Sequence, residues 1–350
     1  MRILIVKTSS LGDIVQCFPV VDYLMNKHAS AEIDWVVESE FSSVVDAHPL
    51  IANVISVQTK RWRKALLNIN TWKQITQVRK RIRQNKYDIV IDLQGNLKSG
   101  VFTKMARSKV KIGFGRKSLP EWPNLLFTNY RYNPKKELNI REEYLSLIQQ
   151  YYSDFSTYKV ETSLLSVSEK ELNQITKILG LPVLDTANCI MVCPGANWRN
   201  KKMTNESMLE FLKLVYEYEQ EPSFVFVWGS EEEKLTCEYL AAFFFETSVV
   251  IKKLSLSALQ NLMSRMKKVL AMDSLPLHLA GTTDTPTFGI FGPSSAHKYH
   301  PFGEDSKSYQ GSCPYGKSFE KRCSILRTCK SGACIRDISV AKLFDSYCSY

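Results

Sequence analysis

Short apolar segments that alternate with helical patterns constrain the fold of this 350-residue chain more than any other feature. In the first half, strand patterns occupy residues 3–6, 32–38, 54–57, 87–93 and 110–113. Helical periodicity fills 71–84 and 138–152. Strands that are nearly continuous in apolar residues and separated by helices are typical of a parallel sheet covered on both faces. The first half therefore predicts a doubly wound α/β domain.

The same alternation begins again after a polar, strand-poor segment at residues 153–166. Ser168-Glu-Lys-Glu171 is a capping box that predicts a helix up to Gly180. Strands are expected at 189–193, 224–228, 268–272 and 287–291, and helices from about 204, 231, 255 and 276. Two such series predict two Rossmann-like domains that face each other across a cleft. We place them at 1–160 and 161–335, with a helix at 336–350 that packs back toward the first domain.

Composition supports a globular protein with an anionic partner. Hydrophobic residues make up 44% of the chain and aromatic residues 11%, as in a chain with a large interior. The apolar run at 3–6 is too short for a signal peptide, and the one at 239–245 is too short to cross a bilayer. We therefore expect a soluble, cytoplasmic protein. The formal charge of +11 suits nucleic acid, an anionic membrane surface or a phosphorylated substrate.

The loop after the first strand carries a carboxylate where a helical pattern restarts, at Asp13. Two roles are open for this residue. It can be a helix N-cap that accepts backbone N–H groups. It can also face a ligand, because ligands of open α/β sheets bind at the carboxyl ends of the strands.

The strands of the second half all end in turn-forming or helix-capping residues. These are Pro194-Gly195, Gly229-Ser230, Asp273-Ser274 and Gly292-Pro293-Ser294, which would lie on one sheet edge. Helix N-termini at such an edge favour phosphate, and Lys201 and Lys202 follow the first of these strands. A nucleotide-like ligand is therefore expected there. The chain has no G-x-G-x-x-G, which disfavours a dinucleotide oxidoreductase, and no P-loop motif, which disfavours a P-loop enzyme. It also has no D-x-D, the simplest carboxylate pair for holding a metal–nucleotide complex.

The densest charge cluster is Lys60-Arg61-Trp62-Arg63-Lys64, after the third predicted strand. It is either a solvated loop or an anion clamp, in which Arg forks bind carboxylate or phosphate and Trp62 stacks on a sugar or ring. Further basic residues lie on the next predicted helix, at Lys73, Arg79, Lys80, Arg81 and Arg83. These residues point to anion recognition in the first domain.

Nine cysteines include no C-x-x-C pair, and four of them fall near the C-terminus: Cys313, Cys323, Cys329 and Cys334. Their spacing favours reduced, partly buried thiols over a metal site. The histidines at 278, 297 and 300 are interpreted from the pattern alone as structural or loop residues.

Several of these segments resemble the lipopolysaccharide heptosyltransferases of glycosyltransferase family 9, and most of all heptosyltransferase I. They are Lys7-Thr-Ser-Ser-Leu-Gly-Asp13-Ile, Asp34-Trp-Val-Val-Glu38, Lys60-Arg-Trp-Arg-Lys64 and Tyr87-Asp-Ile-Val-Ile-Asp92-Leu-Gln-Gly95-Asn-Leu-Lys98-Ser99. In the second half Lys201, Trp228-Gly229, the Asp273 to His278 segment and Phe291-Gly-Pro-Ser294 match in order. The resemblance implies a GT-B architecture and metal-independent, inverting transfer of heptose from ADP-heptose to Kdo of the inner core, with no cofactor.

The resemblance also implies roles for individual residues. Asp13 matches the general base. The implied donor residues are Gly12, Lys201, Glu232, Asp273, Ser274 and His278. Among them, Lys201 would neutralise the ADP phosphates and Asp273 would bind the heptose. Which glutamate of residues 231–233 contacts the ribose is open, and Glu232 is our choice. The acceptor residues, for Kdo carboxylates and lipid A phosphate, are Lys60, Arg61, Arg63, Lys64, Gln94 and Lys98. No metal ligand is implied. The partners are ADP-heptose, Kdo-lipid A and the anionic inner-membrane surface at its cytoplasmic face, and no nucleic acid.

Two positions depart from the family pattern. Asp-Thr-Gly reads Asp273-Ser274-Leu275, and a histidine is missing from Leu138-Asn-Ile-Arg141-Glu142. Leucine in place of a glycine changes how closely backbone approaches phosphate. The alternatives are therefore a same-fold transferase with another nucleotide sugar or lipid acceptor, and a non-catalytic protein that binds anionic glycolipid.

Overall fold

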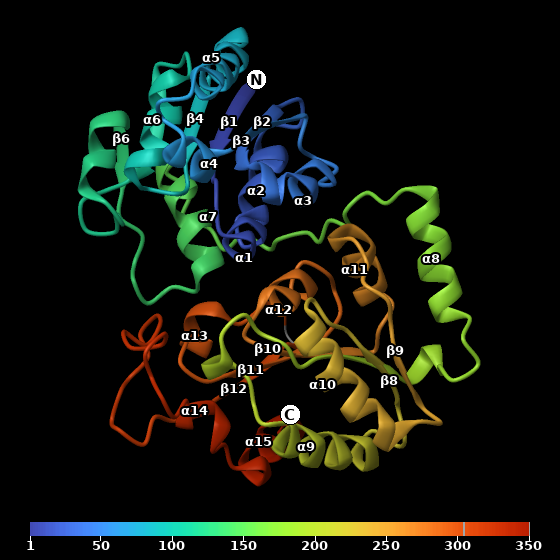
Figure 1. Ribbon diagram of the computed structural model, residues 1–350. Coiled ribbons are helices and arrows are strands. Elements are labelled where there is room, and N and C mark those ends of the chain that lie inside the picture. Colours follow the sequence, from blue (N-terminus) through green and yellow to red (C-terminus); the bar gives the residue numbers. More distant parts are fainter. Residues whose placement is uncertain (304, 350) are drawn as a thin grey trace. The chain divides into compact units, whose positions relative to one another are not determined.

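The computed structural model describes residues 1–303 and 305–349, and the chain divides into two compact units (Figure 1). The first unit is Met1–Ser166, and the second begins at Val167. The polar segment at 153–166 thus belongs to the first unit, and the division falls a few residues later than the position expected from composition. Each unit is described on its own below.

The first unit contains a parallel six-stranded sheet with the order β3-β2-β1-β4-β5-β6. Its strands are β1 (Arg2–Val6), β2 (Glu32–Glu38), β3 (Asn53–Val57), β4 (Ile89–Asp92), β5 (Val110–Phe114) and β6 (Tyr130–Tyr132). Its helices are α1 (Leu11–Val15), α2 (Phe18–Lys27), α3 (Ser42–Asp46), α4 (Thr59–Lys64), α5 (Ile69–Gln84), α6 (Leu97–Met105) and α7 (Ile140–Tyr151), with 3₁₀ turns η1 (Ser39–Phe41) and η2 (Trp122–Phe127).

The second unit contains another parallel six-stranded sheet, with the order β12-β11-β10-β7-β8-β9. Its strands are β7 (Cys189–Cys193), β8 (Ser223–Phe226), β9 (Ser248–Val250), β10 (Lys268–Met272), β11 (Thr287–Phe291) and β12 (Lys307–Gln310). Its helices are α8 (Glu169–Leu179), α9 (Asn205–Tyr218), α10 (Glu231–Ala241), α11 (Leu256–Met263), α12 (Leu275–Ala280), α13 (Ala296–Tyr299), α14 (Ala333–Arg336) and α15 (Val340–Cys348), with η3 (Thr186–Asn188), η4 (Arg199–Lys201) and η5 (Ala242–Phe244).

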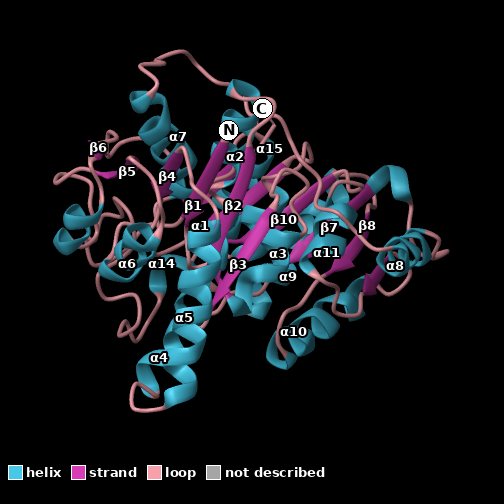
Figure 2. Ribbon diagram, turned by 90° about the horizontal axis from the view of Figure 1, so that it is seen from above, coloured by secondary structure: helices cyan, strands magenta, loops and turns pink. Residues whose placement is uncertain are grey.

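Both sheets have the same topology when their strands are numbered in chain order, namely 3-2-1-4-5-6. This is the order of the Rossmann fold, and helices lie on both faces of the strands (Figure 2). The strand order reverses between β1 and β4 in the first unit and between β7 and β10 in the second. Ligands of such sheets bind beyond the carboxyl ends of the strands at this switch point. The prediction of two Rossmann-like units in an α/β chain is confirmed.

Burial explains which strands were recognisable from sequence. The central strands are buried: residues 3–6 of β1 are 0% exposed, and no residue of β7 or β10 is more than 8% exposed. The reason is that these strands lie in the middle of their sheets. The edge strands β6, β9 and β12 are only three or four residues long and partly exposed, which is too short for a strand pattern, and the sequence does not predict them.

Three elements differ from expectation. Residues 60–64 form helix α4 and are not a loop. Helix α1 begins at Leu11, so Asp13 is its third residue and Ser10 is the N-cap. The C-terminal helix α15 packs on its own unit, where Leu343 and Tyr347 join the core beside α9 and β12, although the sequence suggested that it returns toward the first unit.

Within the described residues, no helix is both long enough and apolar enough to span a bilayer.

Candidate functional site

Asp13 lies in the first turn of α1, directly after Gly12 and beyond the carboxyl end of β1. Its Oδ2 accepts hydrogen bonds from the Ser10 backbone N–H at 3.1 Å and from the Ser10 hydroxyl at 2.6 Å. This is a capping box in which Asp13 occupies the third helical position. The helix start therefore fixes the carboxylate at the switch point of the first sheet, which is where a reacting ligand would be met.

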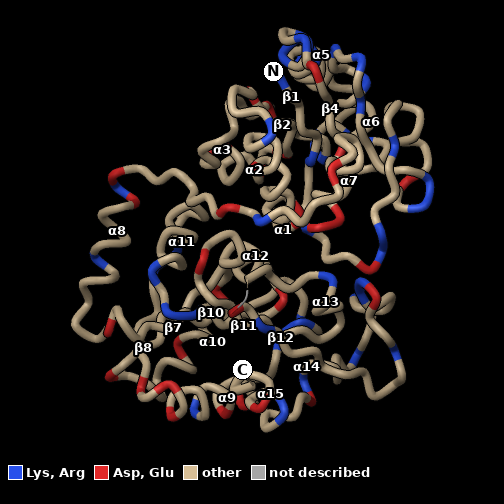
Figure 3. Tube along the Cα trace, turned by 180° about the vertical axis from the view of Figure 1, so that it is seen from behind, with Lys and Arg blue, Asp and Glu red and all other residues tan. Residues whose placement is uncertain are grey.

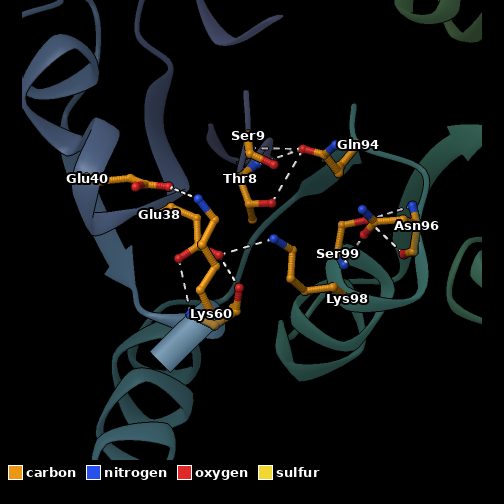
Figure 4. Close-up of polar contacts among 10 residues, drawn as sticks. Thr8, Ser9, Glu38, Glu40, Lys60, Gln94, Asn96, Lys98 and Ser99 are labelled. Atoms are coloured by element: carbon orange, nitrogen blue, oxygen red, sulfur yellow. Dashed lines mark hydrogen bonds and ion pairs between the residues drawn. The ribbon is translucent and has the colours of Figure 1, made fainter. Parts of the chain in front are cut away.

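Gln94 ties the loop after β1 to the loop after β4. Its Oε1 accepts the backbone N–H groups of Thr8 at 3.1 Å and Ser9 at 3.0 Å, and the Thr8 hydroxyl lies at 3.4 Å (Figure 4). The sequence assigned Gln94 to acceptor binding. In the structure its side-chain oxygen positions the segment that leads into Asp13.

Asp92 organises the loop that carries Gln94 and Lys98, a role the sequence did not reveal. Its carboxylate accepts the N–H groups of Gln94 and Gly95 and also side-chain donors from three residues, Ser99, Thr103 and Asn124. Complete burial raises the pKa of Asp92, although these hydrogen bonds oppose the shift. Gly95 has φ of +70°, and a Cβ there would lie 2.8 Å from Pro120 Cδ, so the turn requires glycine.

Two of the predicted acceptor lysines are held by carboxylates at the end of β2. Lys98 Nζ lies 3.1 Å from Glu38 Oε1, and Glu38 also accepts hydrogen bonds from the N–H and hydroxyl of Thr59 at the start of α4. Lys60 Nζ lies 2.5 Å from Glu40 Oε1, and this contact raises the pKa of Lys60 (Figure 4). These lysines can meet an anionic ligand only by sharing or leaving their present partners.

The other basic residues of α4 are available to a ligand. Arg61, Arg63 and Lys64 are exposed, and none forms an ion pair within residues 1–303 and 305–349. Trp62 does not stack outward as predicted. It is buried in the core with Ile82, and its Nε1–H donates to Gln74 Oε1 at 2.8 Å. Trp62 therefore anchors α4, and the helix presents its cations to solvent.

Two predicted donor residues meet at the switch point of the second sheet. Lys201 follows β7, Asp273 follows β10, and Lys201 Nζ lies 2.5 Å from Asp273 Oδ2. Their side chains are only 11% and 5% exposed. The Nε2 of His278, on α12, lies 3.7 Å from Asp273 Oδ1. The sequence predicted all three as donor residues but did not predict that they contact one another.

Charge and an unpaired hydroxyl distinguish this position from its surroundings. Burial by itself would raise the pKa of Asp273, but the charges of Lys201 and His278 outweigh it and lower the pKa overall. Ser274 Oγ, at the start of α12, is buried and finds no hydrogen-bond partner among the described residues. A buried hydroxyl without a partner is costly, and a ligand oxygen would relieve that cost.

The glutamates at the start of α10 occupy different places. Glu232, predicted to bind the ribose, is 79% exposed on its side chain and pairs with Lys202 Nζ at 2.6 Å, which lowers its pKa. Glu233 reaches back over the strand ends. Its Oε2 accepts the Gly229 N–H at 2.8 Å, and a Cβ on Gly195 would lie 2.3 Å from Glu233 Cδ. Glu233 thus lies nearer the switch point than Glu232.

The C-terminal cysteines lie next to η4. Cys313, Cys323, Cys329 and Cys334 line one small pocket, and Asn200 Nδ2–H donates to the carbonyl oxygens of Leu326 and Cys329 at 2.9 and 2.7 Å. All four thiols are free. Across the described residues, no group of three or more His, Cys, Asp or Glu is arranged to hold a metal ion.

Comparison with known proteins gives consistent results. Residues 75–328 match the family described as glycosyltransferase family 9 (heptosyltransferase). Lipopolysaccharide heptosyltransferase 1 of Pseudomonas aeruginosa is 27% identical over 331 residues, which cover 94% of this chain and 89% of that protein.

Solved structures give the same picture at the level of the fold. E. coli heptosyltransferase WaaC with ADP-2-deoxy-2-fluoro heptose superimposes with a TM-score of 0.73 at 24% identity, covering 89% of this chain and 94% of that one. The structure of WaaC with ADP gives 0.72 at 25% identity, covering 88% and 92%. The chain therefore has the GT-B fold of these transferases, with two Rossmann-like units.

Proposed function

Since the chain belongs to glycosyltransferase family 9, the heptosyltransferases, we propose that it transfers L-glycero-D-manno-heptose from ADP-heptose to a Kdo sugar of the lipopolysaccharide inner core. The observation that carries the donor side is the buried Lys201–Asp273 pair beside the unpaired Ser274 hydroxyl. The relatives support the choice of sugar and nucleotide, because the P. aeruginosa protein is named a lipopolysaccharide heptosyltransferase and WaaC was solved with ADP and an ADP-heptose analogue.

The donor would bind at the β7–β10 switch point of the second unit. Lys201 would exchange Asp273 for the diphosphate and neutralise the charge that grows on ADP as it leaves. Asp273, freed from this contact, would accept hydrogen bonds from heptose hydroxyls, with His278 beside it and Ser274 donating to a phosphate oxygen. Glu232 is the ribose contact expected from sequence, and Glu233 competes for that role because it lies over the strand ends.

Asp13 would act as the general base in the first unit, with Gly12 leaving room for the donor beside it. As an ionised carboxylate, Asp13 would take the proton of the attacking hydroxyl. Direct attack of this hydroxyl on the anomeric carbon, opposite the departing ADP, inverts the configuration there. The charge on the leaving group is balanced by Lys201, so the proposed mechanism requires no metal ion.

The acceptor would bind the basic residues of the first unit. Arg61, Arg63 and Lys64 are exposed; the two arginines can form forked contacts with Kdo carboxylates or lipid A phosphate, and Lys64 can add a single ion pair. Lys60 and Lys98 would join them by leaving Glu40 and Glu38, and Gln94 would hold the loop. We place this acceptor in the cytoplasmic leaflet of the inner membrane, with the protein bound peripherally there. The first unit is then the acceptor domain and the second the nucleotide-sugar domain.

The test measures heptose transfer from ADP-heptose to Kdo-lipid A by the purified protein and by two variants. Asp13→Asn should retain ADP affinity and lose about 10²–10⁴-fold in turnover, the usual contribution of a general base. Because Asp13 also belongs to the capping box of α1, Ser10→Ala is the matched control: it removes the hydroxyl contact of that box and leaves both the carboxylate and the backbone N–H that donates to it. Near-normal turnover in Asp13→Asn, or an equal loss in both variants, would remove Asp13 as the base.

The donor is tested in parallel. Leu275 stands where the family has glycine, so UDP- and GDP-sugars are assayed beside ADP-heptose. Efficient transfer from another nucleotide sugar would assign the same fold to a different reaction, and binding without any transfer would leave a glycolipid-binding protein. Activity should persist in EDTA, and a loss reversed by Mg²⁺ would refute the metal-independent mechanism.

A further inference from the structure

The turn between α4 and α5 exposes a group of large apolar side chains. Leu66, Leu67, Ile69 and Trp72 are 52%, 104%, 71% and 55% exposed. We call residues 65–73 the α4–α5 tip. Single exposed apolar residues are ordinary on a protein surface, whereas four within seven positions form a patch of the kind that marks an interaction site.

The core of the unit does not account for this patch. The inward face of α5 comprises the buried residues Thr71 and Ile82, with Ile75 and Val78 packed against the same core as Trp62. The helix therefore buries its own apolar stripe beneath the tip. The exposed residues of the tip are additional to what the fold requires.

The tip is an ordered turn. The Trp72 Nε1–H donates to the Leu66 carbonyl at 2.8 Å, and the Asn68 side chain caps α5 by accepting the Asn70 N–H at 2.8 Å. The Ala65 N–H donates to the Trp62 carbonyl at 3.0 Å, which closes α4. Figure 2 shows α4 and the beginning of α5 together at one margin of the first unit. The apolar side chains are thus held outward by local hydrogen bonds.

The charge around the tip indicates what kind of partner it would bind. Residues 59–86 contain ten Lys and Arg and no Asp or Glu, so this segment alone carries +10 of the formal +11 of the chain. Figure 3 shows these cations along α5. Arg61, Arg63 and Lys64 are exposed directly before the tip, and Lys73 directly after its last apolar residue. A second copy of the chain would bring like charges together, whereas an anionic lipid surface offers both an apolar interior and negative headgroups.

We propose that the α4–α5 tip inserts into the interface of an anionic bilayer while the basic segment 59–86 contacts lipid phosphates. Leu67 and Ile69 enter the headgroup–acyl boundary, and Trp72 lies at the headgroup level that tryptophan favours. Neighbouring cations each add attraction to the negative surface, which salt weakens. This inference rests on the proposed function, because a lipid-linked acceptor would be met at that surface by the Arg61–Lys64 cluster.

The first experiment measures binding of the full chain to phosphatidylcholine vesicles with and without phosphatidylglycerol, in the absence of any acceptor. Wild type should sediment with the anionic vesicles, less so as salt rises. Leu67→Ser/Ile69→Ser should weaken this partition about tenfold or more, since two large aliphatic side chains no longer leave water. The matched control is Leu235→Ser/Phe245→Ser, which removes two exposed apolar residues of the second unit and should bind as wild type does.

The second measurement locates Trp72. Brominated lipids should quench wild-type fluorescence on anionic vesicles, and Trp72→Phe should remove most of that quenching. Equal vesicle binding by wild type and Leu67→Ser/Ile69→Ser would overturn the proposal. Binding that requires Kdo-lipid A in the vesicle would also overturn it, as would a dimer in solution that the double variant dissociates.

Turnover on a deacylated, water-soluble Kdo acceptor separates this inference from the proposed function. Leu67→Ser/Ile69→Ser should match wild type in that assay and fall behind only on membrane-embedded acceptor. A wild-type protein that binds anionic vesicles but transfers nothing would contradict the proposed function and leave the tip as a membrane contact.

Discussion

Replacing Asp273 with Asn should both destabilise the second unit and change how it responds to ADP. The Lys201 ammonium and the Asp273 carboxylate lie 2.5 Å apart and are 11% and 5% exposed, so little water screens them. Removing one partner of a buried pair leaves the other charge uncompensated, at a cost of about 3–5 kcal/mol. For a domain of this size that corresponds to a fall in Tm of about 10 °C.

The diphosphate of ADP should restore much of this loss, because it offers Lys201 a new anionic partner without competition from Asp273. The rise in Tm on adding saturating ADP is therefore expected to be larger in Asp273→Asn than in wild type. ADP affinity, measured by calorimetry, should be retained or increased, while heptose transfer falls.

Glu219→Gln is the matched control for Asp273→Asn. Glu219 forms a second buried ion pair in the same unit, with Lys268 Nζ at 3.0 Å, and it also contacts the more exposed Lys267 Nζ at 2.7 Å. This pair lies away from the β7–β10 switch point. It should lower Tm and leave the ADP-induced rise as in wild type. An Asp273→Asn protein within about 1 °C of wild-type Tm, or one that ADP stabilises no more than Glu219→Gln, would refute the partner exchange of Lys201.

Three further predictions concern the framework. Burial lowers the pKa of His48 to about 4, so the fold favours the neutral ring. The free energy of unfolding, measured with urea, should therefore be full above about pH 6.5 and fall by up to about 3 kcal/mol as pH drops toward 4. His48→Gln should flatten that profile. Hydrogen bonds from the Gly332 N–H and the Ser331 hydroxyl lower the pKa of Cys329. Peptide mass spectrometry should therefore show that iodoacetamide at neutral pH labels Cys329 before the buried thiols, and that Ser331→Ala slows the labelling of Cys329. Gly95→Ala should lower the free energy of unfolding more than Gly316→Ala does. Both glycines have φ near +70°, but only at Gly95 would an added Cβ collide with another side chain, that of Pro120. Equal losses would mean that backbone strain alone determines the cost.

The central strands and their connections could be predicted from sequence, because their signal is local. A strand such as β7, buried on both faces, is apolar at every position, and the capping box at Ser168 marks a helix start by residue type alone. The edge strand β12 has no such signal, since its polar sequence becomes a strand only by pairing with β11. The sequence does not predict helix α4, because six residues with five polar or charged side chains show no apolar face beyond Trp62.

The family resemblance gives candidate residues for the site, but their contacts in the structure could not be predicted from sequence. Lys201 and Asp273 are 72 positions apart, and only the β7–β10 pairing brings them together. Glu232 and Glu233 are equivalent in sequence, yet α10 turns Glu232 toward Lys202 and solvent and Glu233 toward Gly195 and Gly229. Asp92 reads as one more strand residue, and its five donors come from segments as distant as Asn124.

These contacts share a physical logic that residue identities alone do not convey. In the structure, the cations proposed to meet phosphate or carboxylate at close range, Lys60, Lys98 and Lys201, each contact a carboxylate of the protein. An anionic ligand must then supply more interaction than the carboxylate it displaces, so binding of each substrate should release Glu40, Glu38 or Asp273 for a new role. For Asp273 we propose that this role is to accept hydrogen bonds from the heptose. Arg61, Arg63 and Lys64 have no such carboxylate within the part of the chain that the structure describes, which suits a first, long-range encounter with an anionic surface before the paired lysines exchange partners.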